Sequence, residues 1–98
     1  MNKMKDIRII VSSKHLANQL NELNTDEIYR VDVDGDNCIA ISTATQSVDI
    51  HCVVDSIDKR LYPEGRRWDW LRKLVNQVDE QPIILEISEV SLKVYFVY

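Results

Sequence analysis

Three aspartates at alternate positions come closest to a metal-binding motif. Asp32, Asp34 and Asp36 stand at i, i+2 and i+4, as the first ligands of a calcium-binding loop do. Such a loop also needs a glycine at its sixth position and a bidentate glutamate at its twelfth, but these positions hold Asn37 and Thr43. We therefore interpret the aspartates as the solvent-exposed end of a hairpin, and we predict no metal site.

Two histidines and two serines provide residue types that metal sites and nucleophilic enzymes use. His15 and His51 have no second ligand at metal-binding spacing, so both are predicted to be ordinary surface or boundary residues. Ser12 and Ser13 precede His15, but they stand where a helix cap belongs, and no glycine-rich oxyanion loop accompanies them. The serines are interpreted as caps.

Further catalytic and cofactor motifs are missing from the sequence. A phosphate-binding loop needs several glycines close together, whereas Gly35 and Gly65 stand alone. None of the 16 acidic residues has an apolar setting that would shift its pKa. The sequence therefore predicts no catalytic residue, no cofactor and no small-molecule substrate, and a small enzyme is the least favoured of three functional hypotheses.

Positive charge is concentrated in residues 59–73. This segment has six basic and two acidic residues, a net charge of +4, so the remainder of the chain carries −8. Aromatic residues lie among the basic ones, as on surfaces that meet phosphate or an acidic partner. The alternative is a solvated loop and helix start with tryptophans in the core. We favour that alternative for Trp68 and leave both open for the basic residues, although a pI near 5.0 weighs against tight non-specific nucleic-acid binding.

The two cysteines, Cys38 and Cys52, are too few for a disulfide scaffold. A hairpin turn centred on Thr45 would place them opposite each other on neighbouring strands, so a cross-strand disulfide is geometrically conceivable. Two buried thiols are the favoured interpretation, as in a reducing compartment. The sequence does not decide their redox state.

The elements that position these residues follow from hydrophobic periodicity. Alternating apolar residues predict a strand over residues 6–12, and leucines at helical spacing predict a helix over residues 13–23. Residues 55–67 have no sustained period, although a short strand at residues 60–62 is considered. The same two periods predict the remaining elements: strands over residues 29–33, 39–43 and 48–54, a helix over residues 67–78, and strands over residues 82–87 and 92–98.

This order of elements indicates the α+β class. One antiparallel sheet with both helices packed on one face is expected, in the order β-α-β-β-β-α-β-β. The two halves repeat a pattern without repeating residues, because each helix is followed by an alternating hairpin. The length of 98 residues predicts a single domain over residues 1–98.

The first residues lack the apolar stretch of a signal peptide, and no apolar run has the length of a membrane span. A cytoplasmic location without a membrane partner is expected.

The last predicted strand has the character of an interaction edge. It is rich in β-prone residues, and its last four residues carry no side-chain charge. If the strand lies at a sheet edge, it can pair with another chain. We therefore name Val94, Phe96 and Tyr98 as a candidate oligomer edge.

Several local patterns resemble one domain of the bacterial sliding clamp, the ring-shaped processivity factor of DNA polymerase. The resemblance is carried by residues 7–23 (IRIIVSSKHLANQLNEL), residues 28–42 (IYRVDVDGDNCIAIS) and the second helix with its strands over residues 68–98. It implies a non-catalytic protein that acts by assembly, with basic helix residues facing DNA without reading its sequence. The chain has one such domain and lacks its last strand, so neither a ring nor a polymerase-binding pocket is implied. The matching positions are Lys14 on the first helix and Arg66, Arg67, Arg72 and Lys73 around the second.

The leading hypothesis is a clamp-like binding module that self-associates or docks on a larger protein partner, with nucleic acid as a further partner class. The second hypothesis is a regulatory or inhibitory protein that binds another protein through an acidic surface, which includes Asp32, Asp34 and Asp36.

Overall fold

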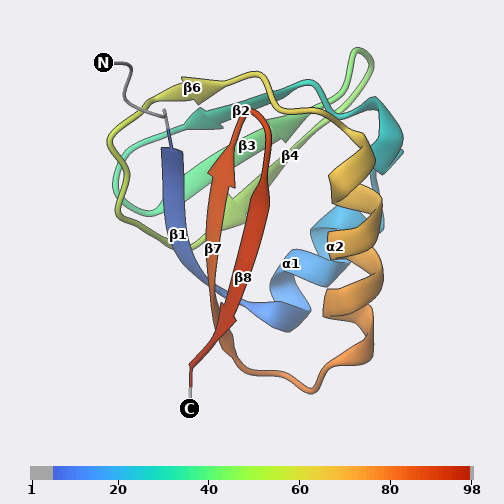
Figure 1. Cartoon of the computed structure of the whole chain (residues 1–98), viewed down its shortest axis with the longest axis vertical. Helices are drawn as coiled ribbons and strands as arrows, with labels where there is room; N and C mark the ends of the chain where they lie inside the picture. Colours follow the sequence, from blue (N-terminus) through green and yellow to red (C-terminus); the bar gives the residue numbers. More distant parts are fainter. Residues whose placement is uncertain (1–5, 98) are drawn as a thin grey trace.

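The computed structural model describes residues 6–97 and shows two helices and two antiparallel sheets (Figure 1). The predicted α+β class and the predicted order of elements are confirmed. In chain order the elements are β1 (Asp6–Ser12), α1 (Ser13–Leu20), the 3-10 turn η1 (Thr25–Glu27), β2 (Arg30–Val33), β3 (Cys38–Ser42), β4 (Ser47–His51), β5 (Val53–Val54), β6 (Arg60–Leu61), α2 (Arg66–Gln77), β7 (Pro82–Ser88) and β8 (Leu92–Phe96).

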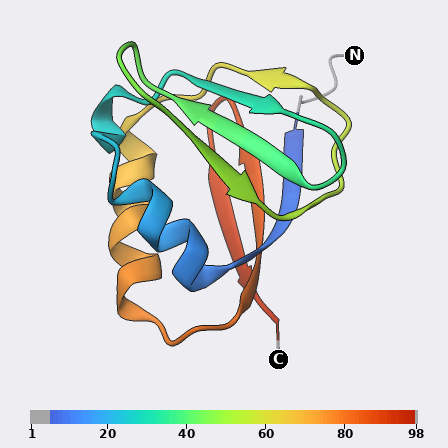
Figure 2. The same ribbon diagram turned by 180° about the vertical axis from the view of Figure 1, so that it is seen from behind.

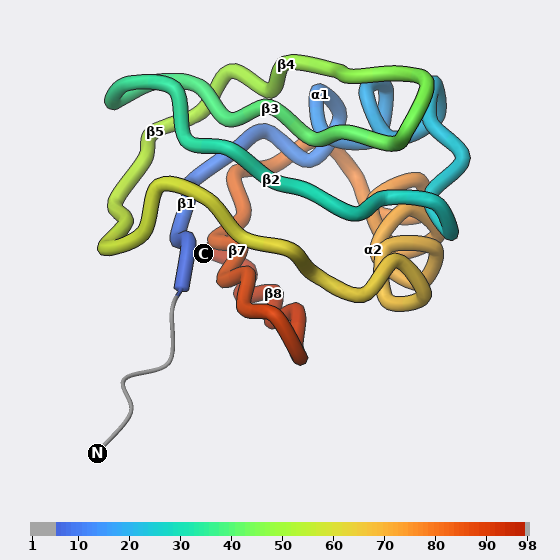
Figure 3. The backbone as a smooth tube through the Cα atoms, turned by 90° about the horizontal axis from the view of Figure 1, so that it is seen from above, coloured from blue at the N-terminus to red at the C-terminus, as the bar shows by residue number. Residues whose placement is uncertain are grey.

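The strands form two sheets where one was predicted. Sheet A has the order β5-β1-β7-β8, and sheet B has the order β4-β3-β2-β6 (Figure 3). The predicted strand over residues 48–54 is interrupted at Cys52, so β4 belongs to sheet B and β5 to sheet A. Alternation continues through this corner, and a period of two therefore could not reveal that the chain changes sheets.

The core lies between the sheets because every second residue of their strands is apolar and points inward. Ile7 and Ile9 of β1 are fully buried, and so are Ile39 and Ile41 of β3 in the opposite sheet. Each such side chain stabilises the fold by about 1.5–3 kcal/mol relative to an exposed one.

Helix α1 begins at Ser13 because Ser12 caps it. The Ser12 Oγ accepts a hydrogen bond from the backbone N–H of His15 at 3.2 Å, which confirms the predicted cap. Ser13 does not cap the helix: its buried hydroxyl accepts from the backbone N–H of Gln81 at 3.1 Å. The helix ends at Leu20, three residues earlier than predicted. Leu23 is nonetheless buried, from a turn in which its N–H donates to the Leu20 carbonyl at 3.1 Å.

Helix α2 packs its apolar stripe inward, and both helices lie on the same side of the molecule (Figure 2). Two asparagines join the helices. The Asn21 side-chain amide donates to Asn76 Oδ1 at 2.9 Å, and the Asn76 amide donates to Asn21 Oδ1 at 3.0 Å. Within residues 6–97, neither helix has the length and apolar character needed to cross a membrane.

The fold contains two halves that exchange a strand. β1 precedes α1 but pairs with β7, the first strand after α2. Similarly, β6 precedes α2 but pairs with β2, the first long strand after α1. The repeat of pattern in the sequence thus corresponds to an approximate internal two-fold relation, with the reciprocal asparagine pair where the two helices meet.

Candidate binding surface on helix α2

The outward side of α2 presents cations around an exposed tryptophan. Three residues at helical spacing (Trp68, Leu71 and Val75) are buried, which turns the residues between them to solvent. Trp70 is 52% exposed. Arg66 and Arg67 lie four and three positions before it, and Lys73 lies three positions after it. The α2 surface is defined here as Arg66, Arg67, Trp70 and Lys73.

Trp68 belongs to the core, as favoured from the sequence. Its side chain is fully buried, and its Nε1 has no hydrogen-bond partner among the described residues. Its role is packing, so the two tryptophans have separate surroundings.

Asp69 forms ion pairs with two of the candidate binding residues, Arg72 and Lys73. Its carboxylate accepts from Arg72 Nη2 at 2.8 Å and pairs with Lys73 Nζ at 3.1 Å. These hydrogen bonds, that from Arg72 first, lower the pKa of Asp69, so it stays ionised. Arg72 and Lys73 are therefore partly neutralised, whereas Arg66 and Arg67 are exposed and form no ion pair within residues 6–97.

Lys14 lies in the first turn of α1 and is exposed. It is the one lysine or arginine of that helix, and Glu22 follows on an exposed position. The outer side of α1 is consequently not a cationic surface of the kind found on α2.

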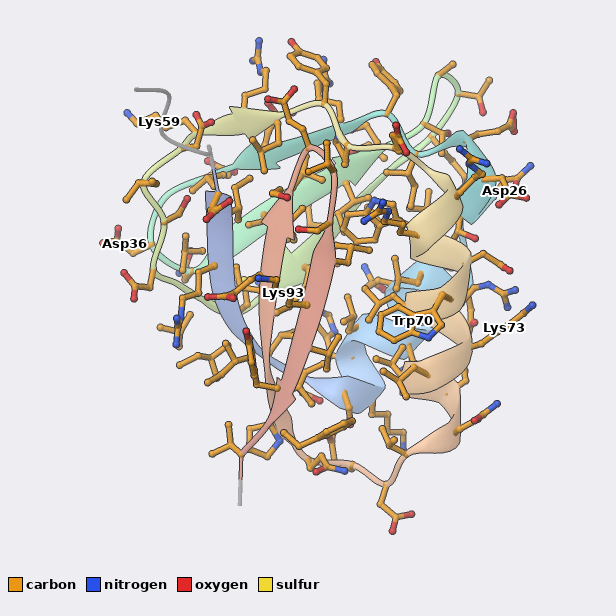
Figure 4. The ribbon with its side chains drawn as sticks, viewed as in Figure 1. Asp26, Asp36, Lys59, Trp70, Lys73 and Lys93 are labelled. Atoms are coloured by element: carbon orange, nitrogen blue, oxygen red, sulfur yellow. The ribbon has the colours of Figure 1, made fainter. Side chains whose placement is uncertain are left out.

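The basic segment over residues 59–73 is divided in space. Lys59 and Lys73 lie on opposite sides of the molecule (Figure 4). Arg60 donates from Nε to Asp32 Oδ1 at 2.6 Å, and this hydrogen bond raises the pKa of Arg60 above its usual value. Asp32 also pairs with Arg30 at 2.9 Å, so the first part of the basic segment is attached to sheet B rather than to the α2 surface.

The three aspartates mark a hairpin, in agreement with the sequence interpretation. Asp34 and Asp36 are exposed on either side of Gly35, whose φ of +77° suits the tight turn between β2 and β3. Within residues 6–97, no three His, Cys, Asp or Glu side chains are arranged to hold a metal ion. Because Asp32 is ion-paired, only two of the three acids are unpaired at this end.

The two histidines meet, which their separation in the sequence did not reveal. Their ring centroids lie 5.8 Å apart, and His15 Nε2 accepts from the backbone N–H of His51 at 3.0 Å. Gln19 reinforces this contact, because its Nε2 donates to the Asp49 carbonyl at 2.8 Å. These residues attach α1 to the edge of β4, and the hydrogen bond requires an unprotonated Nε2 on His15.

The predicted pairing of the cysteines is wrong by one residue. Cys38 lies opposite His51, and the Cys52 N–H donates to the Asn37 carbonyl at 3.0 Å. The hairpin is centred between Ala44 and Thr45, so the cysteines are not directly opposite. Both are free thiols, but each is only partly buried, whereas two buried thiols were predicted. Desolvation by this partial burial raises the pKa of Cys52 to about 11.

The candidate oligomer edge is an edge in the structure. Among residues 6–97, β8 pairs with β7 alone and ends the strand order of sheet A. Val94 and Phe96 point inward but remain partly exposed, and Tyr98 lies outside the described residues.

No family model matches the chain, and no curated protein or solved structure matches it.

Proposed function

We propose that the chain is a non-catalytic, clamp-like binding module that contacts the phosphate backbone of nucleic acid through the α2 surface. The observation that carries the proposal is the pair of exposed, unpaired arginines beside Trp70. Arginine presents several donors to phosphate, and an exposed indole supplies a face for stacking. Such contacts hold a backbone without reading its sequence.

The distribution of charge supports a local rather than a general attraction. The net charge of −4 repels nucleic acid from most of the surface. A contact that is confined to α2 would therefore be weak in the isolated domain and would depend strongly on salt. This is the behaviour expected of a module that is held on its target by a partner or by assembly.

Replacing Arg66 by glutamate tests the proposal, and the Arg66→Glu/Arg67→Glu variant strengthens the test. We expect the double variant to bind a fluorescent DNA duplex at least about tenfold more weakly at low salt, because two phosphate contacts become repulsive. Binding is measured by fluorescence anisotropy over a salt titration. Arg66 and Arg67 are preferable to Arg72 and Lys73, whose replacement would also remove the partners of Asp69.

Lys59→Glu provides the matched control. It makes the same change of charge as Arg66→Glu but lies on the other side of the molecule, so it should affect DNA binding much less. Equal losses in the two variants, or no binding by the wild-type protein at low salt, would contradict the proposal. The latter result would favour a protein partner for the acidic hairpin end at Asp34 and Asp36.

A cytoplasmic location is part of the proposal. Cys38 and Cys52 are unpaired, and thiols of this kind persist in a reducing compartment.

A further inference from the structure

Within residues 6–97, the two halves of the fold differ at the outer strands of their sheets, because β5 lies beside β1 in sheet A without a counterpart beside β6, and β4 of sheet B has no counterpart in sheet A. In sheet B, β3 lies between β2 and β4. Its counterpart in sheet A is β8, the second strand after α2, and in the described part of the chain β8 has β7 on one side and no strand on the other. Sheet A therefore lacks the strand that would correspond to β4.

The two helices can be matched residue by residue. A shift of 55 positions superimposes the buried residues Leu16 and Leu20 of α1 on Leu71 and Val75 of α2. The same shift relates Asn21 to Asn76, the pair that exchanges two hydrogen bonds. The residues through which α1 contacts its neighbours therefore identify the corresponding residues of α2.

Residues that attach α1 to β4 have partly exposed counterparts on α2. His15 and Gln19 bond the backbone of β4, as described above. Their counterparts are Trp70 and Leu74, of which Trp70 is 52% exposed and Leu74 is partly exposed. Figure 4 shows Trp70 on the side of the molecule that also carries Lys93 of β8.

The free edge of β8 carries unpaired backbone groups. Ser88 N–H donates to the Ser91 carbonyl at 2.9 Å, and bonded and non-bonded pairs alternate from there along an antiparallel ladder. Counting in the observed register, Leu92, Val94 and Phe96 occupy non-bonded pairs with β7. Their backbone N–H and C=O groups thus point away from β7. Such groups are available to pair with an added strand.

Burial shows the effect of the missing neighbour. Ile39 and Ile41 of β3 are completely buried beside β4. The inward residues of β8 pack on the same core but stay partly exposed, and no strand pairs with their outer edge within residues 6–97. A strand added to β8 would complete this burial.

We propose that the β8 edge and Trp70 take up an extended segment of a partner protein, in which apolar residues alternate with acidic ones. Its apolar side chains would lie beside Val94 and Phe96 on the core side, and its acidic side chains would point to the opposite side of the sheet, which bears Lys93. The pattern resembles that of β4, where Val48 and Ile50 point inward and Asp49 outward. The mode is strand addition to a sheet edge.

A second copy of β8 is a poorer occupant on grounds of charge. The strand itself has no acidic residue, so a second copy would add another Lys93 to this face and no carboxylate beyond Glu86 of β7, which already lies opposite the first lysine. An acidic partner segment is electrostatically complementary, and alternating apolar residues give it the period of a strand.

The probe is a blocked heptapeptide that alternates valine and glutamate. Titration with it should shift the fluorescence of Trp70 in the wild-type protein. In titration calorimetry, which does not need the indole, the Trp70→Ala variant should bind at least about tenfold more weakly, as expected for an aromatic anchor. A heptapeptide with lysine in place of glutamate should bind at least about tenfold more weakly than the first.

Val94→Pro tests the edge itself. Proline removes the N–H that points away from β7, so the ladder with β7 is kept while strand addition is blocked. Peptide affinity should fall at least about tenfold. Val94→Thr, which keeps the N–H and the β-branched shape, is the matched control, and circular dichroism checks that each variant is folded.

A peptide with methyl groups on alternate backbone nitrogens gives the same test without changing the protein. Its failure to bind, together with binding by the unmodified peptide, supports the proposal. Unchanged binding to Val94→Pro or to the methylated peptide overturns it, as does equal affinity for the lysine peptide.

A wild-type dimer that Val94→Pro dissociates, seen by light scattering, would assign the edge to a second copy. DNA binding should be unaffected by Val94→Pro, so the two proposals fail independently.

Discussion

At the scale of single residues, close contacts and hydrogen bonds decide the consequences of substitution. Gly65 and Gly35 illustrate this, because the two glycines are required for different reasons. A Cβ on Gly65 would collide with the backbone carbonyl of Asp26, whereas a Cβ on Gly35 would meet open space. Gly35 instead needs its positive φ.

Gly65→Ala is expected to destabilise the protein by about 1–3 kcal/mol, because the carbonyl of Asp26 belongs to the backbone and cannot move aside without shifting η1. Denaturant unfolding measures the free energy. Gly35→Asn is the control, since asparagine tolerates a positive φ and should cost less. If Gly65→Ala lowers the free energy of unfolding no more than Gly35→Asn does, then η1 can shift at little energetic cost, and the prediction is wrong.

Glu80 links stability to pH at the start of α1. Its carboxylate accepts from Ser12 Oγ at 2.6 Å, and this hydrogen bond is the main reason that its pKa is lowered from 4.5. The folded state thus holds the proton less tightly than the unfolded state does. The resulting stability is fully present above pH 4.5 and is lost as the pH falls through the lowered pKa. Glu80→Gln should flatten this part of the profile of unfolding free energy against pH, and a slope as steep as that of the wild type would exclude Glu80 as its origin.

At the scale of elements, α2 separates residues that hold the fold from residues that are available for binding. Adjacent positions differ completely: Leu71 is fully buried, and Trp70 is half exposed. The helical period places them on different sides, so an apolar residue on the outer side needs an explanation other than packing.

Leu71→Ala is expected to lower the free energy of unfolding by about 2–5 kcal/mol through the cavity that it leaves. Trp70→Ala should change it by no more than about 0.5 kcal/mol, as at other surface positions. Thermal and denaturant unfolding of both variants provide the comparison. A large loss for Trp70→Ala would mean that the indole stabilises the domain, and the role assigned to it in binding would then have to be reconsidered.

At the scale of the whole molecule, the exchanged strands β1 and β6 tie the two halves into one core. Each half contributes a strand to the other half's sheet, so neither sheet can form from one half alone. The same relation exposes a difference between the halves at the edge of β8, which no strand covers within residues 6–97. The molecule thus presents a cationic helix and an open sheet edge next to each other on one side.

The sequence by itself determined the α+β class, the order of elements and the residues that face the core. It could do so because periods of two and of 3.6 report which side of an element is buried. Strand Asp6–Ser12 was predicted with its observed bounds, and Trp68 was correctly assigned to the core.

Only the tertiary structure decided how the elements are partnered. Periodicity shows that a side is covered but not what covers it, so the corner at Cys52 and the division into two sheets were not predicted. The hairpin register was missed by one residue because the sequence does not state where its turn is centred. The basic segment looked continuous, yet ion pairs with Asp32 and Asp69 divide it between sheet B and α2. The role proposed for Trp70 likewise depends on strand β4, which lies beside α1 and has no counterpart in sheet A among the described residues. Only the folded chain allows this comparison.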